Sequence, residues 1–187
     1  FRSGKSNTSG FSNIFIGSEA GLVNSSGFDN VFMGSVSGTS NTTGSENIFI
    51  GFQSGNKNTT GQNNIFIGSE SGRSNLTGNN NIYIGTESGL DNTDGNHNMY
   101  IGNGAGKFAK GSNSLFIENS GSGSPLIFGD FGRRMVVING VGSNNNLESV
   151  FYVNGASGGT TAWSNNSDRR LKKNIATIKN PLDKILK

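Results

Sequence analysis

Cysteine is absent from this chain of 187 residues, and proline occurs only twice. Without cysteine the chain can hold neither a disulfide framework nor a thiolate metal site. Hydrophobic residues make up only 31% of the chain, which is low for an ordinary globular core. No run is long and apolar enough to cross a membrane, so direct membrane insertion is not expected. These absences favour either a disordered chain or a repeat protein with a thin core.

Basic charge is scarce in most of the chain, although the formal net charge is +3. Residues 7–106 hold two basic and seven acidic side chains, whereas residues 168–187 hold seven basic and two acidic ones. A nucleic-acid-binding protein needs a basic face along the surface that meets the phosphates. The excess positive charge belongs to the C-terminal tail, and the sequence therefore predicts no nucleic-acid partner.

Glycine and asparagine are abundant, and they recur with a period of 17 residues between Asn7 and Gly106. Each period contains Asn, a small residue, any residue, Gly, two variable residues, Asn, an apolar triplet and Gly. The first asparagine recurs at Asn7, Asn24, Asn41, Asn58, Asn75 and Asn92, and the second at Asn13, Asn30, Asn47, Asn64, Asn81 and Asn98. Such a period is typical of a solenoid, in which one coil cannot bury its apolar residues alone.

The apolar triplets predict short strands, because they consist of β-branched and aromatic residues. The first triplet is Ile14-Phe15-Ile16, and a degenerate seventh copy ends at Ile117. Successive side chains of a strand point to opposite faces, so the aromatic residue lies on one face and its two neighbours on the other. We expect an all-β solenoid of 17-residue coils over residues 1–118, with residues such as Ile14 and Ile16 filling the inside of each coil.

On this interpretation the aromatic residues form a ladder on the outside of the coils. Its members are Phe15, Phe32, Phe49, Phe66, Tyr83, Tyr100 and Phe116. A thin rod cannot leave such an apolar stripe in water, so the ladder predicts an interface with other copies of the chain. We expect a homotrimeric fibre with the aromatic residues near its axis. The period leaves open whether each coil winds within one chain or is shared among three.

The period breaks after Ile117, and the remaining chain divides at two changes of composition. Residues 119–166 predict a small β-rich module with strands at 126–128, 135–138, 150–153 and 160–163. Residues 167–187 are basic, and Pro181 there suits the first turn of a short helix. Phe1 falls in mid-repeat, so we expect the chain to be part of a longer protein whose export signal lies upstream.

The run from Trp163 to Ile175, which includes Ser-Asp-Arg-Arg-Leu-Lys-Lys-Asn-Ile from Ser167 onward, closely resembles the opening of the endosialidase-type intramolecular chaperone domain. Phage tailspikes and tail fibres carry this domain at their C-termini. The resemblance implies that the domain trimerises the chains and then removes itself. It also implies a cut between Ser167 and Asp168, with Ser167 as nucleophile and Lys172 as general base. A desolvated lysine can activate a serine in this way. Beyond this single self-cleavage, the sequence predicts no enzyme.

The repeats are also similar to the β-roll heads of trimeric autotransporter adhesins, although the present coil is longer. The pairing of such repeats with the chaperone opening resembles the mosaic adhesive trimers of predatory bacteria. It implies an extracellular fibre on a bacterial surface or a virion that adheres to a cell-surface glycan or protein receptor. The alternative is a phage tail fibre or tailspike, and a third class is a tailspike that degrades polysaccharide. No cofactor or metal is expected.

Individual residues suggest few binding sites. Phe52 replaces a residue that is Ser or Thr in most coils, and Trp163 could stack on a sugar ring, so both are candidate contacts for a glycan. Both are equally consistent with packing. The Asn-Xaa-Ser/Thr triplets of the first asparagine position match glycan acceptors, but turn formation also explains them. No cysteine or carboxylate cluster accompanies His97, so we expect it to be a surface residue and not a metal ligand. Glu70 and Glu87 occupy one repeat position, where solvated like charges are expected rather than a cation site.

Overall fold

The computed structural model describes residues 2–121, 123 and 125–138, all within one compact unit of the chain. These residues form nine strands and no helix. The strands are β1 (Ile14–Ile16), β2 (Val31–Met33), β3 (Ile48–Ile50), β4 (Ile65–Ile67), β5 (Ile82–Ile84), β6 (Met99–Ile101), β7 (Ser114–Ile117), β8 (Ile127–Asp130) and β9 (Met135–Ile138). Every apolar triplet is therefore a strand, as predicted. The strands expected at 150–153 and 160–163 and the helix expected near Pro181 lie outside the described residues.

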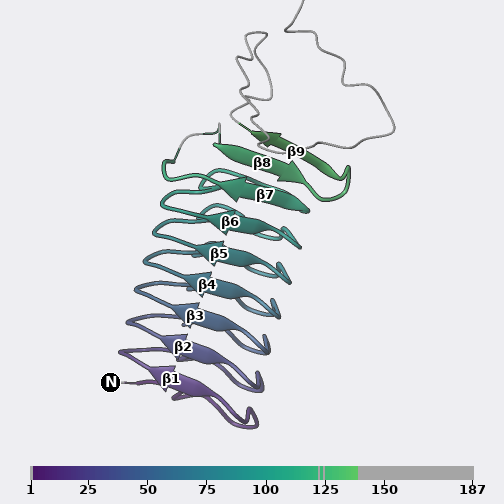
Figure 1. Cartoon of the computed structure of the whole chain (residues 1–187). Coiled ribbons are helices and arrows are strands. Elements are labelled where there is room, and N and C mark those ends of the chain that lie inside the picture. Colours follow the sequence, from purple (N-terminus) through teal and green to yellow (C-terminus); the bar gives the residue numbers. More distant parts are fainter. Residues whose placement is uncertain (1, 122, 124, 139–187) are drawn as a thin grey trace, which may run out of the picture. The chain divides into compact units, whose positions relative to one another are not determined.

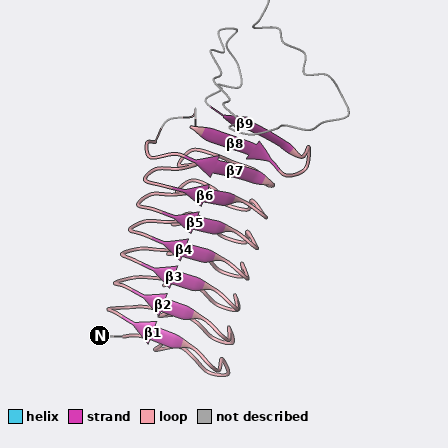
Figure 2. Cartoon of the chain, viewed as in Figure 1, coloured by secondary structure: helices cyan, strands magenta, loops and turns pink. Residues whose placement is uncertain are grey.

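The strands form one sheet in chain order, and β1 to β7 are parallel (Figure 1). Each coil leaves the sheet at the end of one strand and comes back to form the next strand beside it, so the coils wind within a single chain. Strands β8 and β9 pair antiparallel with β7 and with each other and end the stack, and loops make up the rest of each coil (Figure 2). The structure is thus the predicted β-solenoid, with in-register pairing that places each residue over its counterpart in the next coil.

The aromatic residues lie inside the coils, and the prediction that they face outward to form a trimer interface is wrong. Phe32, Phe49, Phe66, Tyr83 and Tyr100 are 0% exposed, while the end members Phe15 and Phe116 are partly buried and pack against the same core. Adjacent rings from Phe32 to Tyr100 stack with centroids 4.8–4.9 Å apart and interplanar angles of 4–6°. The rings therefore fill the core of one chain and cannot contact another copy.

The thinness of the coil explains why the rings point inward. A Cβ atom built on Gly38 would lie 2.6 Å from the Phe32 ring, and Gly38 has a φ of 54°, which glycine adopts without strain. The neighbouring Ser37 is fully buried, and its hydroxyl donates to the carbonyl of Phe49 at 3.0 Å. The opposite wall of each coil is therefore held close to the ring. The interior takes one flat side chain per coil, and the two aliphatic residues of each strand point outward.

Two ladders of buried asparagine side chains fill the rest of the interior. In the first ladder, Asn41 Nδ2 donates to Asn24 Oδ1 at 2.7 Å and to its own turn at Gly44 O at 2.9 Å. In the second, Asn47 Nδ2 donates to Asn30 Oδ1 at 3.2 Å and to Gly61 O at 2.8 Å. Parallel in-register strands favour such ladders, because each amide meets an identical amide one coil away.

Burial of the first ladder excludes most of the possible glycan acceptors. Asn24, Asn41, Asn58 and Asn75 are 0% exposed, and their amide nitrogens already donate hydrogen bonds within the stack. An acceptor asparagine must present its amide at the surface. These residues are therefore structural, which confirms the prediction that the triplets form turns.

The first ladder ends where the repeat shortens by one residue. Paired residues are 17 apart up to Tyr83 and Tyr100, but Tyr100 pairs with Phe116, only 16 residues later. Here Asn92 Nδ2 donates to Gly111 O, and Asn92 Oδ1 accepts from the amide of Gly95. Asn75 Oδ1 is consequently buried without a hydrogen-bond donor. The regular stack thus stops one coil before the antiparallel strands.

Candidate functional site

The outward face of the parallel strands carries two columns of aliphatic side chains, here called the aliphatic stripe. The column at the start of each strand consists of Ile14, Val31, Ile48, Ile65, Ile82, Met99 and Leu115. The column at the end of each strand consists of Ile16, Met33, Ile50, Ile67, Ile84, Ile101 and Ile117. Strand alternation dictates this position once the aromatic residues are inside. Sequence reasoning had placed these residues in the core.

The aliphatic stripe is accessible to solvent in the single chain. Ile14 and Ile16 in the first coil are 50% and 55% exposed, and Met33 and Ile84 are each 37% exposed. The other members are partly buried, because identical side chains above and below cover their flanks. No charged residue interrupts either column. Isolated apolar residues are common on protein surfaces, whereas a continuous uncharged patch of this kind is a candidate interaction site.

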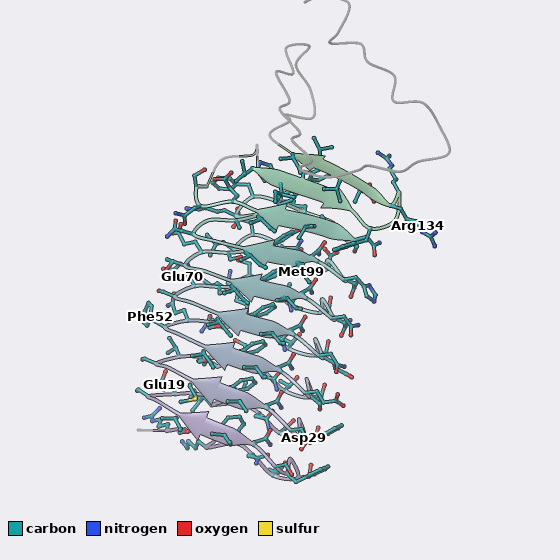
Figure 3. All side chains as sticks on the ribbon, in the orientation of Figure 1. Glu19, Asp29, Phe52, Glu70, Met99 and Arg134 are labelled. Carbon is teal, nitrogen blue, oxygen red and sulfur yellow. The ribbon has the colours of Figure 1, made fainter. Side chains whose placement is uncertain are left out.

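Two edges of different chemistry border the aliphatic stripe. The edge where strands begin, here the start edge, carries Ser12, Asp29, Glu46, Asn63, Asn80 and His97, all exposed and all with positive φ. The edge where strands end, here the end edge, carries Ser18, Ser35, Phe52, Ser69, Thr86 and Asn103. Asp29 and Phe52 lie on opposite edges (Figure 3). The start edge therefore includes the charged residues Asp29 and Glu46, whereas the six end-edge positions are uncharged. Glu19 and Glu70 each follow an end-edge residue directly and lie on the same side as Phe52 (Figure 3).

At its C-terminal end the aliphatic stripe runs into an apolar cleft of about 520 Å³. The cleft is lined by Ile101, Gly102, Ile117, Glu118, Asn119 and Leu126. Glu118 holds its rim by accepting hydrogen bonds from the amides of Asn119 at 2.8 Å and Leu126 at 2.9 Å. Hydrogen bonds from the Ser120 hydroxyl and from these amides lower the pKa of Glu118, so it stays ionised at neutral pH. Leu126 is 56% exposed and extends the apolar surface beyond the last parallel strand.

The acidic residues of the described region do not form a metal site. Glu70 pairs with Arg73 at 3.0 Å, and Glu87 pairs with Lys107 at 2.6 Å, so each carboxylate is neutralised by its own cation. No group of three or more His, Cys, Asp or Glu residues comes together in the part of the chain that the structure describes. His97 lies exposed on the start edge, as expected for a surface residue. Among the described residues, no helix is long and apolar enough to span a membrane.

Of the candidate glycan contacts and self-cleavage residues, only Phe52 lies among the described residues. Phe52 is 49% exposed on the end edge, beside the aliphatic stripe. Trp163 and the self-cleavage residues Ser167, Asp168 and Lys172 lie outside the described residues. Comparisons with protein-family models, with curated proteins and with solved structures found no match. The candidate site therefore rests on the aliphatic stripe and its edges.

The two tyrosines of the aromatic column make the core sensitive to alkaline pH. Burial raises the pKa of Tyr83 well above its ordinary value, and the neighbouring Tyr100 raises it further. Burial also raises the pKa of Tyr100, although a hydrogen bond with Ser114 offsets part of the rise. The folded chain therefore keeps these protons at a pH where the unfolded chain releases them, above about pH 10.

We expect the free energy of unfolding to fall above about pH 10 in the wild type, and to fall less in a Tyr83→Phe/Tyr100→Phe variant. The Tyr83 hydroxyl lies near Asn98 but forms no hydrogen bond of normal geometry. Its removal should therefore not destabilise the fold at neutral pH, and a gain on the order of 1 kcal/mol is expected. Urea unfolding of the double variant at neutral and alkaline pH measures the first effect. A Tyr83→Phe chain measures the second at neutral pH, because the double variant also loses the hydrogen bond between Tyr100 and Ser114. Identical pH slopes for the wild type and the double variant would contradict the assignment of these tyrosines to the core.

Proposed function

We propose that the chain belongs to an extracellular homotrimeric fibre that mediates surface adhesion, with the solenoid as its shaft. The aliphatic stripe carries this proposal, because an uncharged apolar face along seven strands is unfavourable in water and needs a partner. Closed cyclic assemblies of identical chains are a common solution for elongated proteins. The expected homotrimer is thus retained, and its interface moves from the aromatic to the aliphatic residues.

The sequence supports the cellular setting of the proposal. The run that begins at Ser167 resembles the opening of an intramolecular trimerisation chaperone, and the repeats resemble adhesin β-roll heads. In this proposal the chaperone assembles three chains and is released between Ser167 and Asp168, with Lys172 as the base. The fibre then binds a cell-surface glycan or protein receptor through residues such as Phe52 and Trp163. The location is a bacterial surface or a virion.

A phage tail fibre or tailspike is the second candidate, and the chaperone-like run favours it, because this domain is typical of such proteins. The physical requirements on the shaft are the same in both cases. Both assign the solenoid a structural role, and neither needs a catalytic site in the shaft.

Substitution of two stripe residues tests the assembly. We expect an Ile50→Ser/Ile67→Ser variant of the full chain to dissociate, because two hydroxyls would then interrupt the apolar contact at adjacent coils. Light scattering should show a fall from three times the 19.6 kDa chain mass to one. Circular dichroism should be unchanged, since both side chains lie outside the core.

The matched control is a Thr43→Ala/Thr60→Ala variant. It alters exposed residues of the same two coils, away from the strands, and should stay trimeric. A wild-type chain that is monomeric at micromolar concentration would contradict the proposal. Dissociation of the control to the same extent as the serine variant would also contradict the stripe as the interface.

A further inference from the structure

We infer that each aliphatic stripe is covered by the stripe of another copy of this chain, with the copies parallel and in coil register. This inference rests on the proposed trimer and specifies its interface. The occupant is a second copy because the stripe is an apolar surface with a fixed repeat. Its side chains recur at the strand spacing of about 4.8 Å, and only a surface of the same period can match every coil. An identical stripe meets that condition along the whole stack.

The area of the stripe indicates that the edges must also join the contact. Seven strands extend about 30 Å, and residues two apart on a strand lie about 7 Å from each other. With the width of the side chains, the stripe covers on the order of 400 Å², about half of the ~800 Å² per partner found in stable interfaces. A pair of chains joined through the stripe alone would therefore be weak. An arrangement around an axis buries the start and end edges as well.

The chemistry of the edges fits such a ring. When copies are related by rotation about an axis along the coil stack, the start edge of one copy meets the end edge of the next. Asp29 of one copy then lies opposite Ser35 of its neighbour, and Glu46 lies opposite Phe52. In coil register no acidic residue of the start edge meets a like charge, because Asp29 and Glu46 lie in coils where the end-edge residue is followed by Val36 or Gln53. The coils in which a glutamate follows the end edge have Ser12, Asn63 or Asn80 at the start edge. The ring of Phe52 can cover the carbons of Glu46, so in this arrangement Phe52 contacts a neighbouring copy and is not free to contact a receptor.

The parallel arrangement predicts which columns meet. Rotation about the stack axis places the start column of one copy across from the end column of another at the same coil. Ile65 of one copy therefore faces Ile67 of its neighbour. An antiparallel pair would instead place start column against start column and reverse the order of the coils. The two arrangements thus differ in the pairs of residues that can be joined.

Engineered thiols test this difference directly, because the chain contains no cysteine. We would co-express full-length Ile65→Cys and Ile67→Cys chains, one with a larger tag, and treat the assembly with a methylene-bridged bis-methanethiosulfonate. Facing sheets are about 10 Å apart, so thiols on facing side chains come within reach of this short reagent. We expect the mixed Ile65→Cys and Ile67→Cys pair as the dominant cross-linked product on a non-reducing gel.

Two controls define the register and the face. Ile65→Cys mixed with Met33→Cys should cross-link poorly, because the two coils are separated by about 10 Å along the stack. Thr60→Cys lies exposed in the same coil as Ile65 but off the stripe, and should not cross-link within the assembly. A predominant product between two Ile65→Cys chains would indicate antiparallel packing and overturn the inference.

The outcomes also separate this inference from the proposed function. A trimeric mass without any cross-link at the stripe would overturn the inference and leave the fibre standing, with its interface elsewhere. A monomeric mass for the wild type would overturn both. Circular dichroism of each cysteine variant shows whether the coils are intact, so a failure to fold is recognised separately.

Discussion

Replacement of Asn47 by alanine is expected to destabilise the fold by about 3–5 kcal/mol. Asn47 is 0% exposed, and its amide donates to the coil before it and to the turn at Gly61. Its Oδ1 accepts from both the backbone amide and the side-chain amide of Asn64. Alanine would remove these bonds at once and leave buried partners on both sides without water to replace it.

Urea unfolding followed by circular dichroism measures this loss at a fixed protein concentration. Thr43→Ala is the control, because Thr43 is an exposed residue of the same coil outside the stripe and its edges, and we expect a change within about 0.5 kcal/mol. If Asn47→Ala were as mild as Thr43→Ala, the asparagine ladder would not be a stabilising element of the coils.

Replacement of Gly55 by alanine is expected to cost about 3 kcal/mol or more, for two reasons that add. Gly55 has a φ of 55°, in the left-handed region that costs energy for other residues. In addition, a Cβ atom at this position would lie 2.4 Å from the Phe49 ring, which is itself stacked between Phe32 and Phe66. The ring cannot move away without losing its contacts with both neighbours.

Gly123→Ala serves as the control for Gly55→Ala, because no atom lies within 4 Å of a Cβ built there. We expect this control to melt close to the wild type. The comparison separates the general effect of alanine on the unfolded chain from the combined cost of the positive φ and the collision with the ring. Equal melting temperatures for the two variants would show that the aromatic ring does not lie beneath Gly55.

The sequence predicted the solenoid because the period and the composition of the triplets are both local signals. Every triplet from Ile14 onward forms a strand, and the strand expected at 135–138 is β9. The strand expected at 126–128 overlaps β8 only at Ile127 and Phe128, because β8 continues to Asp130. The asparagine ladders also follow from recurrence, because an in-register stack must place each asparagine on its counterpart. These features need no knowledge of which face of a strand is buried.

Alternation along a strand could not show whether the aromatic residues point inward or outward, because it defines two faces but does not say which of them is buried. Each triplet has two aliphatic residues on one face and one aromatic residue on the other. The face with two apolar residues was expected to be buried, and this expectation is wrong. A better signal was present in the sequence: Gly38 and Gly55 follow Phe32 and Phe49 by six residues, and serine precedes each glycine. Small residues at fixed positions indicate a wall pressed against a large side chain. That wall leaves room for one flat ring in the coil.

The residues of the proposed interface between copies could not be assigned from the sequence for a related reason. An apolar column in a repeat belongs either to the core of the coil or to a surface covered by another chain, and the pattern of residues is the same in both cases. Only the exposure of residues such as Ile16 and Met33 in the folded chain separates the two. The expected homotrimer thus remains a proposal, now carried by different residues.

Methionine oxidation tests the central claim, that rings are inside the coil and aliphatic residues outside it under other copies. Met33 is 37% exposed on the stripe of a single chain, and a thioether is oxidised readily when peroxide reaches it. Mass spectrometry should find Met33 protected in the wild-type assembly and rapidly oxidised in the dissociated Ile50→Ser/Ile67→Ser variant. Equal oxidation of Met33 in the two proteins would contradict the account.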